Sequence, residues 1–249
     1  MYAVITAGGR VSGEFAAAIG TPVKALARVG NRTLLHCAID AAREAGAAEV
    51  AVVGGPEVRQ AASRDIDRFI PEAQSGAQNV HLALAAFPGQ SLMYLSSDLP
   101  FISGTVLVEF LSRAPEGSLC MPLAQAAAYE QRFEAAPLHA TVIGKERIAN
   151  GSVFKIPAGG AEIIDSIAQR LFNARKDLLG MAKLMGPGLL LKFLCKQLTI
   201  ADLETHAARV LGFPVFAARN CAPELCFDID SIEDYTYALA TFEKRAAVS

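Results

Sequence analysis

The sequence predicts an α/β fold with a Rossmann-like, mixed but mostly parallel sheet flanked by helices. The first observation is a βαβ unit: an apolar run at residues 2–6, a helical pattern at 33–46 and a second apolar run at 49–53. The joins around the helix are short, so the two strands are parallel and their crossover is right-handed. The second observation is that both runs are continuously apolar, which is typical of strands covered on both faces.

The first half of the chain continues this alternation of strands and helices. In this interpretation the residues between the first strand and Thr21 form a polar, Ala-rich loop. The helix at 33–46 ends at Gly46. The pattern then predicts a helix at 56–64, a strand at 68–71, a polar loop at 72–79, a helix at about 78–87, a strand at 92–97, a helix at 103–113 and a strand at 119–122.

The second half adds antiparallel strands and a block of helices. Turn signals alternate with short apolar runs over 128–157, which predicts antiparallel strands added to the parallel half of the sheet. Thr199 and Asp202 have the spacing of a capping box. We therefore expect a single domain over 1–249 with a helical insertion at about 159–211. The elements expected there and after it are helices at 161–173, 177–185, 188–197 and 200–211, a strand at 215–218 and a helix from Ser231 to about Lys244.

Composition and charge exclude several classes of function. The chain has 249 residues and a formal net charge of −2, so it lacks the basic footprint of a nucleic-acid-binding protein. The apolar stretch at 188–195 is interrupted by Lys192 and is too short to span a bilayer.

The N-terminus has no basic leader, so we expect a cytoplasmic protein. The apolar helices at 178–197 belong either to the core or to a subunit interface, which leaves a homodimer open.

A glycine corner follows the first strand and is the first candidate binding site. Ala7, Gly8 and Gly9 come directly after the apolar run, and Lys24 follows a loop. Glycines permit a tight turn and a close approach by a ligand. Exposed N–H groups in such a corner bind phosphate oxygens, and a lysine adds a mobile charge. An ordinary strand–turn with a surface lysine remains the alternative, because the complete Rossmann and Walker spacings are absent.

Two further loops are expected at the same edge of the sheet. The loop with Gly76, Gln78 and Asn79 follows the strand at 68–71, and its amides either read a nucleobase and ribose or cap the next helix. Asp98 ends the strand at 92–97 and is either a ligand of a hard cation or a turn cap. Arg175 and Lys176 either reach a substrate phosphate or form a solvated turn.

Two acidic residues near the C-terminus complete the candidate site. Asp228 and Asp230 are two residues apart and share a face if the segment is extended. In that case Asp98 and Asp230 hold one cation between them. The alternative is that both C-terminal residues are caps and turn formers.

Six short motifs occur in one order along the chain: TAGG, Pro-x-Lys-Ala-Leu, SGAQN, SSDLPF, NGSVF and FDIDSIEDY. This set resembles the nucleotidyltransferase superfamily with a glycosyltransferase-A-like fold. That group includes sugar-1-phosphate nucleotidylyltransferases, the cytidylyltransferase of isoprenoid synthesis and the guanylyltransferase of molybdenum-cofactor synthesis. The resemblance covers most of residues 1–156 and 213–244.

The resemblance implies a reaction and a role for each candidate. An oxygen of a phosphorylated small-molecule acceptor attacks the α-phosphorus of an NTP, and pyrophosphate leaves with the help of Mg²⁺. The implied nucleotide-binding residues are Ala7, Gly8, Gly9, Gly76, Gln78 and Asn79. The implied catalytic residue is Lys24, with Arg10 in support. The implied metal ligands are Asp98 and Asp230, with Asp228 as a substitute ligand.

One position departs from the family pattern. The family has Gly-x-Gly-x-Arg, whereas residues 11–15 here read VSGEF, so the arginine is missing. Arg10 lies in the same loop and is the candidate replacement. The alternative is a catalytically degenerate nucleotide-binding or regulatory protein on the same fold. A glycosyltransferase is a third possibility, although the strand at 92–97 does not lead to the D-x-D of that class.

Overall fold

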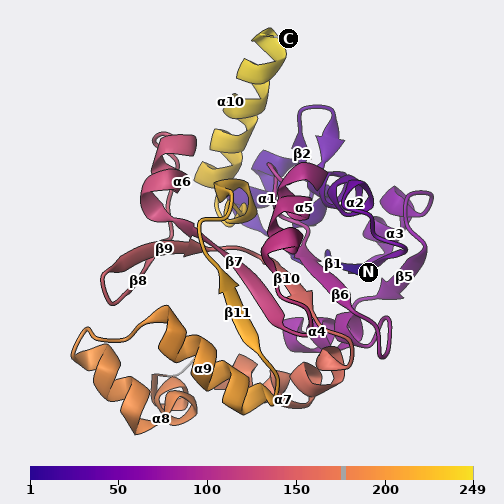
Figure 1. Cartoon of the computed structure of the whole chain (residues 1–249). Coiled ribbons are helices and arrows are strands. Elements are labelled where there is room, and N and C mark those ends of the chain that lie inside the picture. The colour runs from indigo at the N-terminus through magenta and orange to yellow at the C-terminus, as the bar shows by residue number, and fades with distance from the viewer. Residues whose placement is uncertain (175–177, 249) are drawn as a thin grey trace.

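The computed structural model describes residues 1–174 and 178–248 and contains a mixed, mostly parallel sheet with helices on both sides (Figure 1). The fold class predicted from the sequence is therefore confirmed. The strands are β1 (Tyr2–Thr6), β2 (Arg28–Val29), β3 (Arg32–Thr33), β4 (Val50–Gly54), β5 (Arg68–Pro71), β6 (Leu92–Ser96), β7 (Leu119–Gln125), β8 (Thr141–Ile143), β9 (Glu146–Asn150), β10 (Val153–Ile156) and β11 (Val215–Ala218).

The helices alternate with these strands in the first half and dominate residues 160–211. They are α1 (Gly13–Ile19), α2 (Leu34–Glu44), α3 (Pro56–Ala62), α4 (Gly76–Leu84), α5 (Gly104–Arg113), α6 (Ala126–Arg132), α7 (Gly160–Ala174), α8 (Leu178–Leu194), α9 (Ile200–Leu211) and α10 (Ile232–Val248). Two short 3₁₀ turns, η1 (Lys24–Leu26) and η2 (Pro223–Leu225), complete the described elements.

The strand order in the large sheet is β5-β4-β1-β6-β10-β7-β9-β8, and β11 pairs with β7. The β5, β4, β1 and β6 strands are mutually parallel, whereas β10 lies antiparallel between β6 and β7. Thr6 lies level with Val53 on one side and Ser96 on the other. The carboxyl ends of the parallel strands therefore meet at one edge, where open α/β sheets bind ligands.

The parallel strands are buried on both faces, as their continuous apolar sequences predict. Successive β1 residues enter different cores: Ala3 and Ile5 pack with α2 and α5, and Val4 packs with α4. Figure 1 shows these helices on opposite sides of the sheet. Burial on both faces fixes the level at which β1 ends, and therefore the position of the loop that follows it.

Two local expectations were wrong. The Ala-rich loop contains α1, which ends at Gly20 in a left-handed conformation with φ 72°. Short alanine-rich segments form helices that are too brief to show an apolar period. Likewise, α6 occupies part of the segment where only strands were expected. Residues 226–230 form no strand, and only β11 returns to the sheet in this part of the described chain.

The helical segment follows its sequence signals closely. Thr199 caps α9, and its side chain and that of Asp202 form the predicted reciprocal capping box. The expected break between two helices appears as a kink within α8 at Gly186, where φ is 73° and Pro187 follows. Arg175 and Lys176 lie outside the described residues. Among the helices described, none is both long and apolar enough to cross a membrane.

Candidate active site

The glycine corner lies directly beyond the end of β1. Ala7 is fully buried, and its N–H donates to the Val53 carbonyl at 2.8 Å, which anchors the corner to β4. A Cβ atom at Gly8 would lie 2.5 Å from Glu72 Oε2 and 2.9 Å from Asn79 Nδ2. The ends of the Glu72 and Asn79 side chains therefore approach Gly8 closely and would have to move to admit a side chain there.

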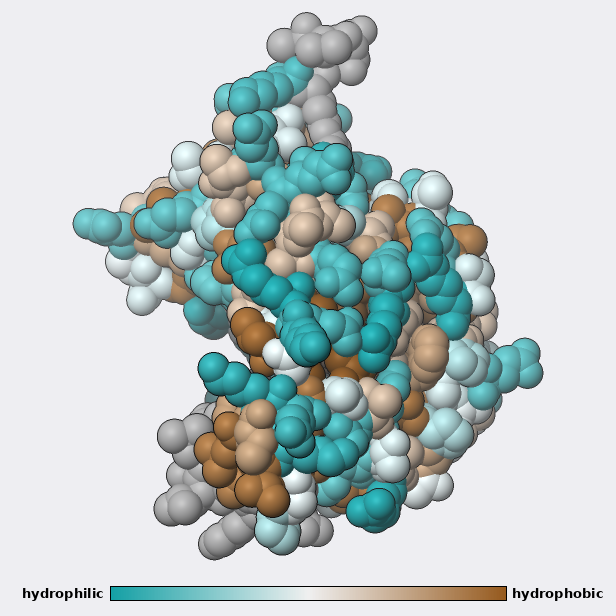
Figure 2. Space-filling model, turned by 60° about the vertical axis from the view of Figure 1, so that its left-hand side comes forward, coloured by the Kyte–Doolittle hydropathy of each residue, from teal (hydrophilic) through white to brown (hydrophobic). Residues whose placement is uncertain are grey.

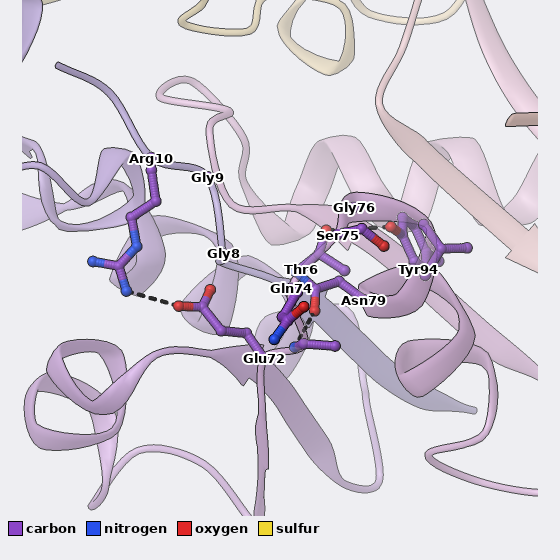
Figure 3. Close-up of a pocket in the computed structure, with 12 residues that line it drawn as sticks. Thr6, Gly8, Gly9, Arg10, Glu72, Gln74, Ser75, Gly76, Asn79 and Tyr94 are labelled. Atoms are coloured by element: carbon purple, nitrogen blue, oxygen red, sulfur yellow. Dashed lines mark hydrogen bonds and ion pairs between the residues drawn. The ribbon is translucent and has the colours of Figure 1, made fainter. Parts of the chain in front are cut away.

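A cavity of about 410 Å³ opens beside this corner (Figure 3). Gly8, Gly9 and Arg10 form one wall, and the loop from Glu72 to Gly76 lies across from them. The other lining residues are Thr6, Asn79, Val80 and Tyr94. The cavity therefore lies between the end of β1 and the loop for which the sequence suggested contacts with a nucleobase and ribose.

The loop that closes the cavity is held by its own side chains. Asn79 Oδ1 accepts from the Ala73 N–H at 2.7 Å. Ser75 caps α4 by accepting from the Gln78 N–H, and its hydroxyl donates to Gln78 Oε1 at 3.1 Å. Of the predicted nucleotide-binding residues, Gly8, Gly9, Gly76 and Asn79 line the cavity, whereas Ala7 lies beneath it and Gln78 does not line it. The capping alternative accounts for the contacts of Gln78.

Lys24 joins the two carboxylates predicted from opposite ends of the chain. Its Nζ lies 2.6 Å from Asp98 Oδ2 and 2.8 Å from Asp230 Oδ1. Its backbone N–H donates to the Gly9 carbonyl at 2.9 Å, so the corner positions the lysine. Burial opposes the charge on Lys24, but Asp98 and Asp230 outweigh it, so the lysine pKa is raised and the ammonium form persists.

The segment carrying Asp228 and Asp230 is fastened to the end of β6. The Ile229 N–H donates to the Asp98 carbonyl at 3.0 Å. The buried Asp234 accepts from the backbone N–H groups of Asp230 and Ser231, which fixes the turn before α10. Asp234 was not among the site residues predicted from the sequence, so this positioning role was missed.

Asp228 lies in different surroundings from Asp230, although the sequence placed both on one face. Ser152 Oγ donates to Asp228 Oδ2 at 3.3 Å, whereas the Asp230 side chain is 61% exposed. Burial, followed by the charges of Asp98 and Asp230, raises the pKa of Asp228 to about 6. Residues 227–230 belong to no strand, but their burial alternates, because Phe227 and Ile229 are buried whereas Asp228 is half-buried and Asp230 is exposed.

The carboxylates have the chemistry that a hard cation needs. Asp98 Oδ1 is buried and has no hydrogen-bond partner, while its other oxygen contacts Lys24. Mg²⁺ usually takes one or two protein carboxylates and completes its shell with water and substrate phosphates. Across the described residues there is no cluster of three or more His, Cys, Asp or Glu side chains arranged for a metal. The donor set therefore fits a cation that arrives with a nucleotide better than a closed metal site.

Arg10, the candidate replacement for the missing arginine, is held at the mouth of the cavity by two glutamates. Its guanidinium contacts Glu57 at 3.0 Å and Glu72 at 2.7 Å. Figure 3 shows the Arg10 side chain turned toward Glu72. The hydrogen bonds that Arg10 donates to Glu57 and then to Glu72 raise the pKa of Arg10, so the guanidinium remains charged. Sequence reasoning missed both glutamates, because nothing in their local pattern marks them.

A sequence profile of MobA-like NTP transferase domains matches residues 3–226. The chain belongs to the MobA-like NTP transferase family. The match continues through α7, α8 and α9, which contain none of the six motifs. No curated protein matches the sequence.

Solved structures agree with this family assignment. A hypothetical transferase from Thermus thermophilus is 26% identical with a TM-score of 0.81, over 94% of this chain and 99% of that chain. A 2-C-methyl-D-erythritol 4-phosphate cytidylyltransferase, also from Thermus thermophilus, has 19% identity and a TM-score of 0.55, over 97% and 98%. A Mycobacterium tuberculosis protein in complex with manganese has 17% identity and a TM-score of 0.54, over 96% and 97%. The last two show a common fold with this NTP transferase-like chain.

Proposed function

We propose that this NTP transferase family member is a Mg²⁺-dependent nucleotidyltransferase. It transfers a nucleoside monophosphate from an NTP to a phosphorylated small molecule, such as a sugar phosphate, and releases pyrophosphate. The observation that carries the proposal is the Lys24 bridge between Asp98 and Asp230, hydrogen-bonded to the glycine corner beside the cavity. A free NTP as substrate also fits the cytoplasmic location predicted from the sequence.

The reaction asks the protein mainly to position groups and to neutralise charge. An oxygen of the acceptor phosphate attacks the α-phosphorus, the bond from that phosphorus to the bridging oxygen breaks, and pyrophosphate departs. The N–H groups of Gly8 and Gly9 are suited to bind phosphate oxygens, and Lys24 supplies positive charge close by. The 410 Å³ cavity then receives the base and ribose against Tyr94 and Asn79.

Asp98 and Asp230 are the residues that would hold the cation, with Asp228 as a further carboxylate nearby. Bound Mg²⁺ would neutralise phosphate charge and polarise the α-phosphoryl group. The unpartnered, buried Asp98 Oδ1 supports this assignment, because an oxygen in that state lacks a compensating donor. The manganese complex of the Mycobacterium tuberculosis protein gives a precedent for a divalent cation on this fold.

The test is pyrophosphate release with CTP, GTP, ATP and UTP against a panel of phosphorylated acceptors, with Mg²⁺ or with EDTA. Asp98→Asn should lower turnover on the order of 10²–10³-fold while circular dichroism and melting temperature stay near wild type. Asp165→Asn is the matched control, because Asp165 is bonded to His81 rather than to the site residues. An active Asp98→Asn protein would contradict the proposal.

The pairing of Arg10 with Glu57 and Glu72 favours one alternative, a nucleotide-binding or regulatory protein that has lost the chemistry. A guanidinium neutralised by two carboxylates contributes little charge to a leaving group. The alternative predicts that an NTP raises the melting temperature, by binding the native state, without pyrophosphate release. Turnover with any acceptor excludes it.

A further inference from the structure

An apolar cavity of about 290 Å³ lies between α9 and the antiparallel part of the sheet. Its lining includes Met121, Leu123 and Ile148. The residues that alternate with them along β7 and β9, Ala124 and Ala149, pack in the core on the other face of the sheet. Figure 2 shows the molecule hollowed between its lower helices, where α9 lies in Figure 1, and the strands above, with hydrophobic side chains inside the hollow. Protein interiors contain few voids larger than a water molecule, so a mostly aliphatic cavity of this size points to a ligand.

Two polar residues mark the mouth of the apolar cavity. Thr141 and Asn150 are the lining residues that are exposed. The Glu204 carboxylate of α9 accepts from the Ala217 N–H at 2.7 Å, so it fastens α9 to β11. None of the described lining residues is basic. The interior therefore suits a hydrocarbon group, because sugar hydroxyls would lose their hydrogen bonds to water there.

The apolar cavity and the nucleotide cavity lie on the same face of the sheet. Tyr94 lines the nucleotide cavity, and its ring centroid lies 6.1 Å from that of Phe154 on β10. Leu119 of β7 packs in the same cluster as these two rings, and Met121, two residues further along β7, faces the same way into the apolar cavity. Because β10 lies between β6 and β7, the two cavities are about 10 Å apart, which is twice the spacing of neighbouring strands.

The end of β9 joins the mouth of the apolar cavity to the candidate active site. Asn150 lies at the mouth, and Ser152 follows two residues later. The Ser152 hydroxyl donates to Asp228 Oδ2 at 3.3 Å, and the Ser152 N–H donates to the Leu225 carbonyl at 3.3 Å. Two residues of extended chain span about 7 Å. One molecule can therefore place a phosphate beside the carboxylates and a hydrocarbon group in the cavity.

We propose that the apolar cavity binds the hydrocarbon part of the acceptor, so that the acceptor is the phosphate monoester of an apolar alcohol. This inference rests on the proposed function, which requires a phosphorylated acceptor and leaves its organic part open. An apolar cavity of about 150 Å³ holds a benzene ring, so this one has room for a chain or ring system of about eight to ten carbons. An oxygen of the acceptor phosphate forms the bond to the α-phosphorus as pyrophosphate leaves, so the product is a nucleoside diphosphate ester of the alcohol.

The first test is a binding measurement that does not depend on turnover. Isothermal titration of the full chain with octyl phosphate, below its micelle concentration and without NTP, should show saturable binding at least about tenfold tighter than that of glycerol 3-phosphate. Ala207→Leu should weaken octyl phosphate binding about tenfold or more, because Ala207 lines the apolar cavity and a leucine side chain would fill part of it. Ala201→Leu is the matched control, since Ala201 lies on the same helix but is exposed and outside the cavity. Circular dichroism checks that both variants are folded.

The second test is pyrophosphate release from each NTP with the same two acceptors. The KM for octyl phosphate should be about tenfold or more below that for glycerol 3-phosphate, and Ala207→Leu should remove most of this difference. Release with glycerol 3-phosphate that octyl phosphate does not improve, or equal octyl phosphate binding by Ala207→Leu and wild type, overturns this inference and leaves the proposed function standing. Absence of release with every acceptor contradicts the proposed function, whereas absence of octyl phosphate binding contradicts the assignment of the cavity.

Discussion

The ammonium nitrogen of Lys24 lies 2.6 Å from one oxygen of Asp98, while the other oxygen of Asp98 is buried without a partner. Lys24 thus occupies one side of the carboxylate on which the proposed cation depends, and it contacts Asp230 as well. Nucleotide phosphates offer Lys24 other partners, so we expect the lysine and the divalent cation to compete until an NTP is bound.

Lys24→Met should therefore bind Mn²⁺ more tightly than wild type in the absence of nucleotide. Removing the competing ammonium from a partly buried ion pair corresponds to about a tenfold gain in affinity. The measurement is titration of free Mn²⁺ by electron paramagnetic resonance. Asp98→Asn should bind Mn²⁺ less tightly than wild type, and unchanged Mn²⁺ affinity in Lys24→Met would show that the two cations do not share the carboxylates.

Arg10→Ala should lower kcat on the order of 10²-fold, as expected for the loss of one preorganised donor to the leaving group. This requires the Arg10 guanidinium to leave Glu57 and Glu72 when phosphates arrive. Steady-state kinetics of pyrophosphate release measures the effect. Arg59→Ala is the control, because Arg59 lies over the Phe69 ring. If kcat is unchanged in Arg10→Ala, the Arg10 ion pairs serve only to hold the loop.

Gly104→Ala should destabilise the fold by about 1–3 kcal/mol through overpacking. An added Cβ would overlap Glu44 Cβ and lie 3.1 Å from the Glu44 backbone carbon, where α5 begins against the end of α2. Urea unfolding at equilibrium measures the free energy of unfolding. Gly188→Ala is the matched control, because a Cβ there meets no described atom within 4 Å. Equal unfolding midpoints for both variants would show that the α2–α5 contact relaxes easily.

Asp67→Asn should reduce the dependence of stability on pH in the acid range. A hydrogen bond from the Val50 N–H, and then the contacts with Arg43, hold the pKa of Asp67 below its usual value. A depressed folded-state pKa gives stability that is present above the unfolded-state pKa and is lost as pH falls through the folded-state pKa.

The Asp67 side chain is 39% exposed, so its ion pair contributes less than about 1 kcal/mol. Urea midpoints at neutral and acid pH measure the effect. Wild type should lose more stability than Asp67→Asn between those two conditions. Parallel losses in the two proteins would contradict the role of Asp67.

The sequence by itself determined the α/β class, the mostly parallel character of the sheet and the family. Continuous apolar runs with short joins are local signals, because burial on both faces leaves no polar alternation in the strand. The break before Pro187 and the capping box at Thr199 were likewise readable, since proline and capping residues act within one helical turn. The α1 and α6 helices escaped detection, because their short alanine-rich sequences, GEFAAAI and AAAYEQR, show no apolar period.

Only the tertiary structure decided which partners the site residues have. Lys24 and Asp230 are 206 residues apart in the chain, and no local pattern states that their side chains meet at 2.8 Å. The pairing of Arg10 with Glu57 and Glu72 was equally invisible, because it requires the ends of β1, β4 and β5 to lie side by side. Side chains from distant loops are brought together by sheet topology, which is set by burial of the whole core and not by their own neighbours in sequence.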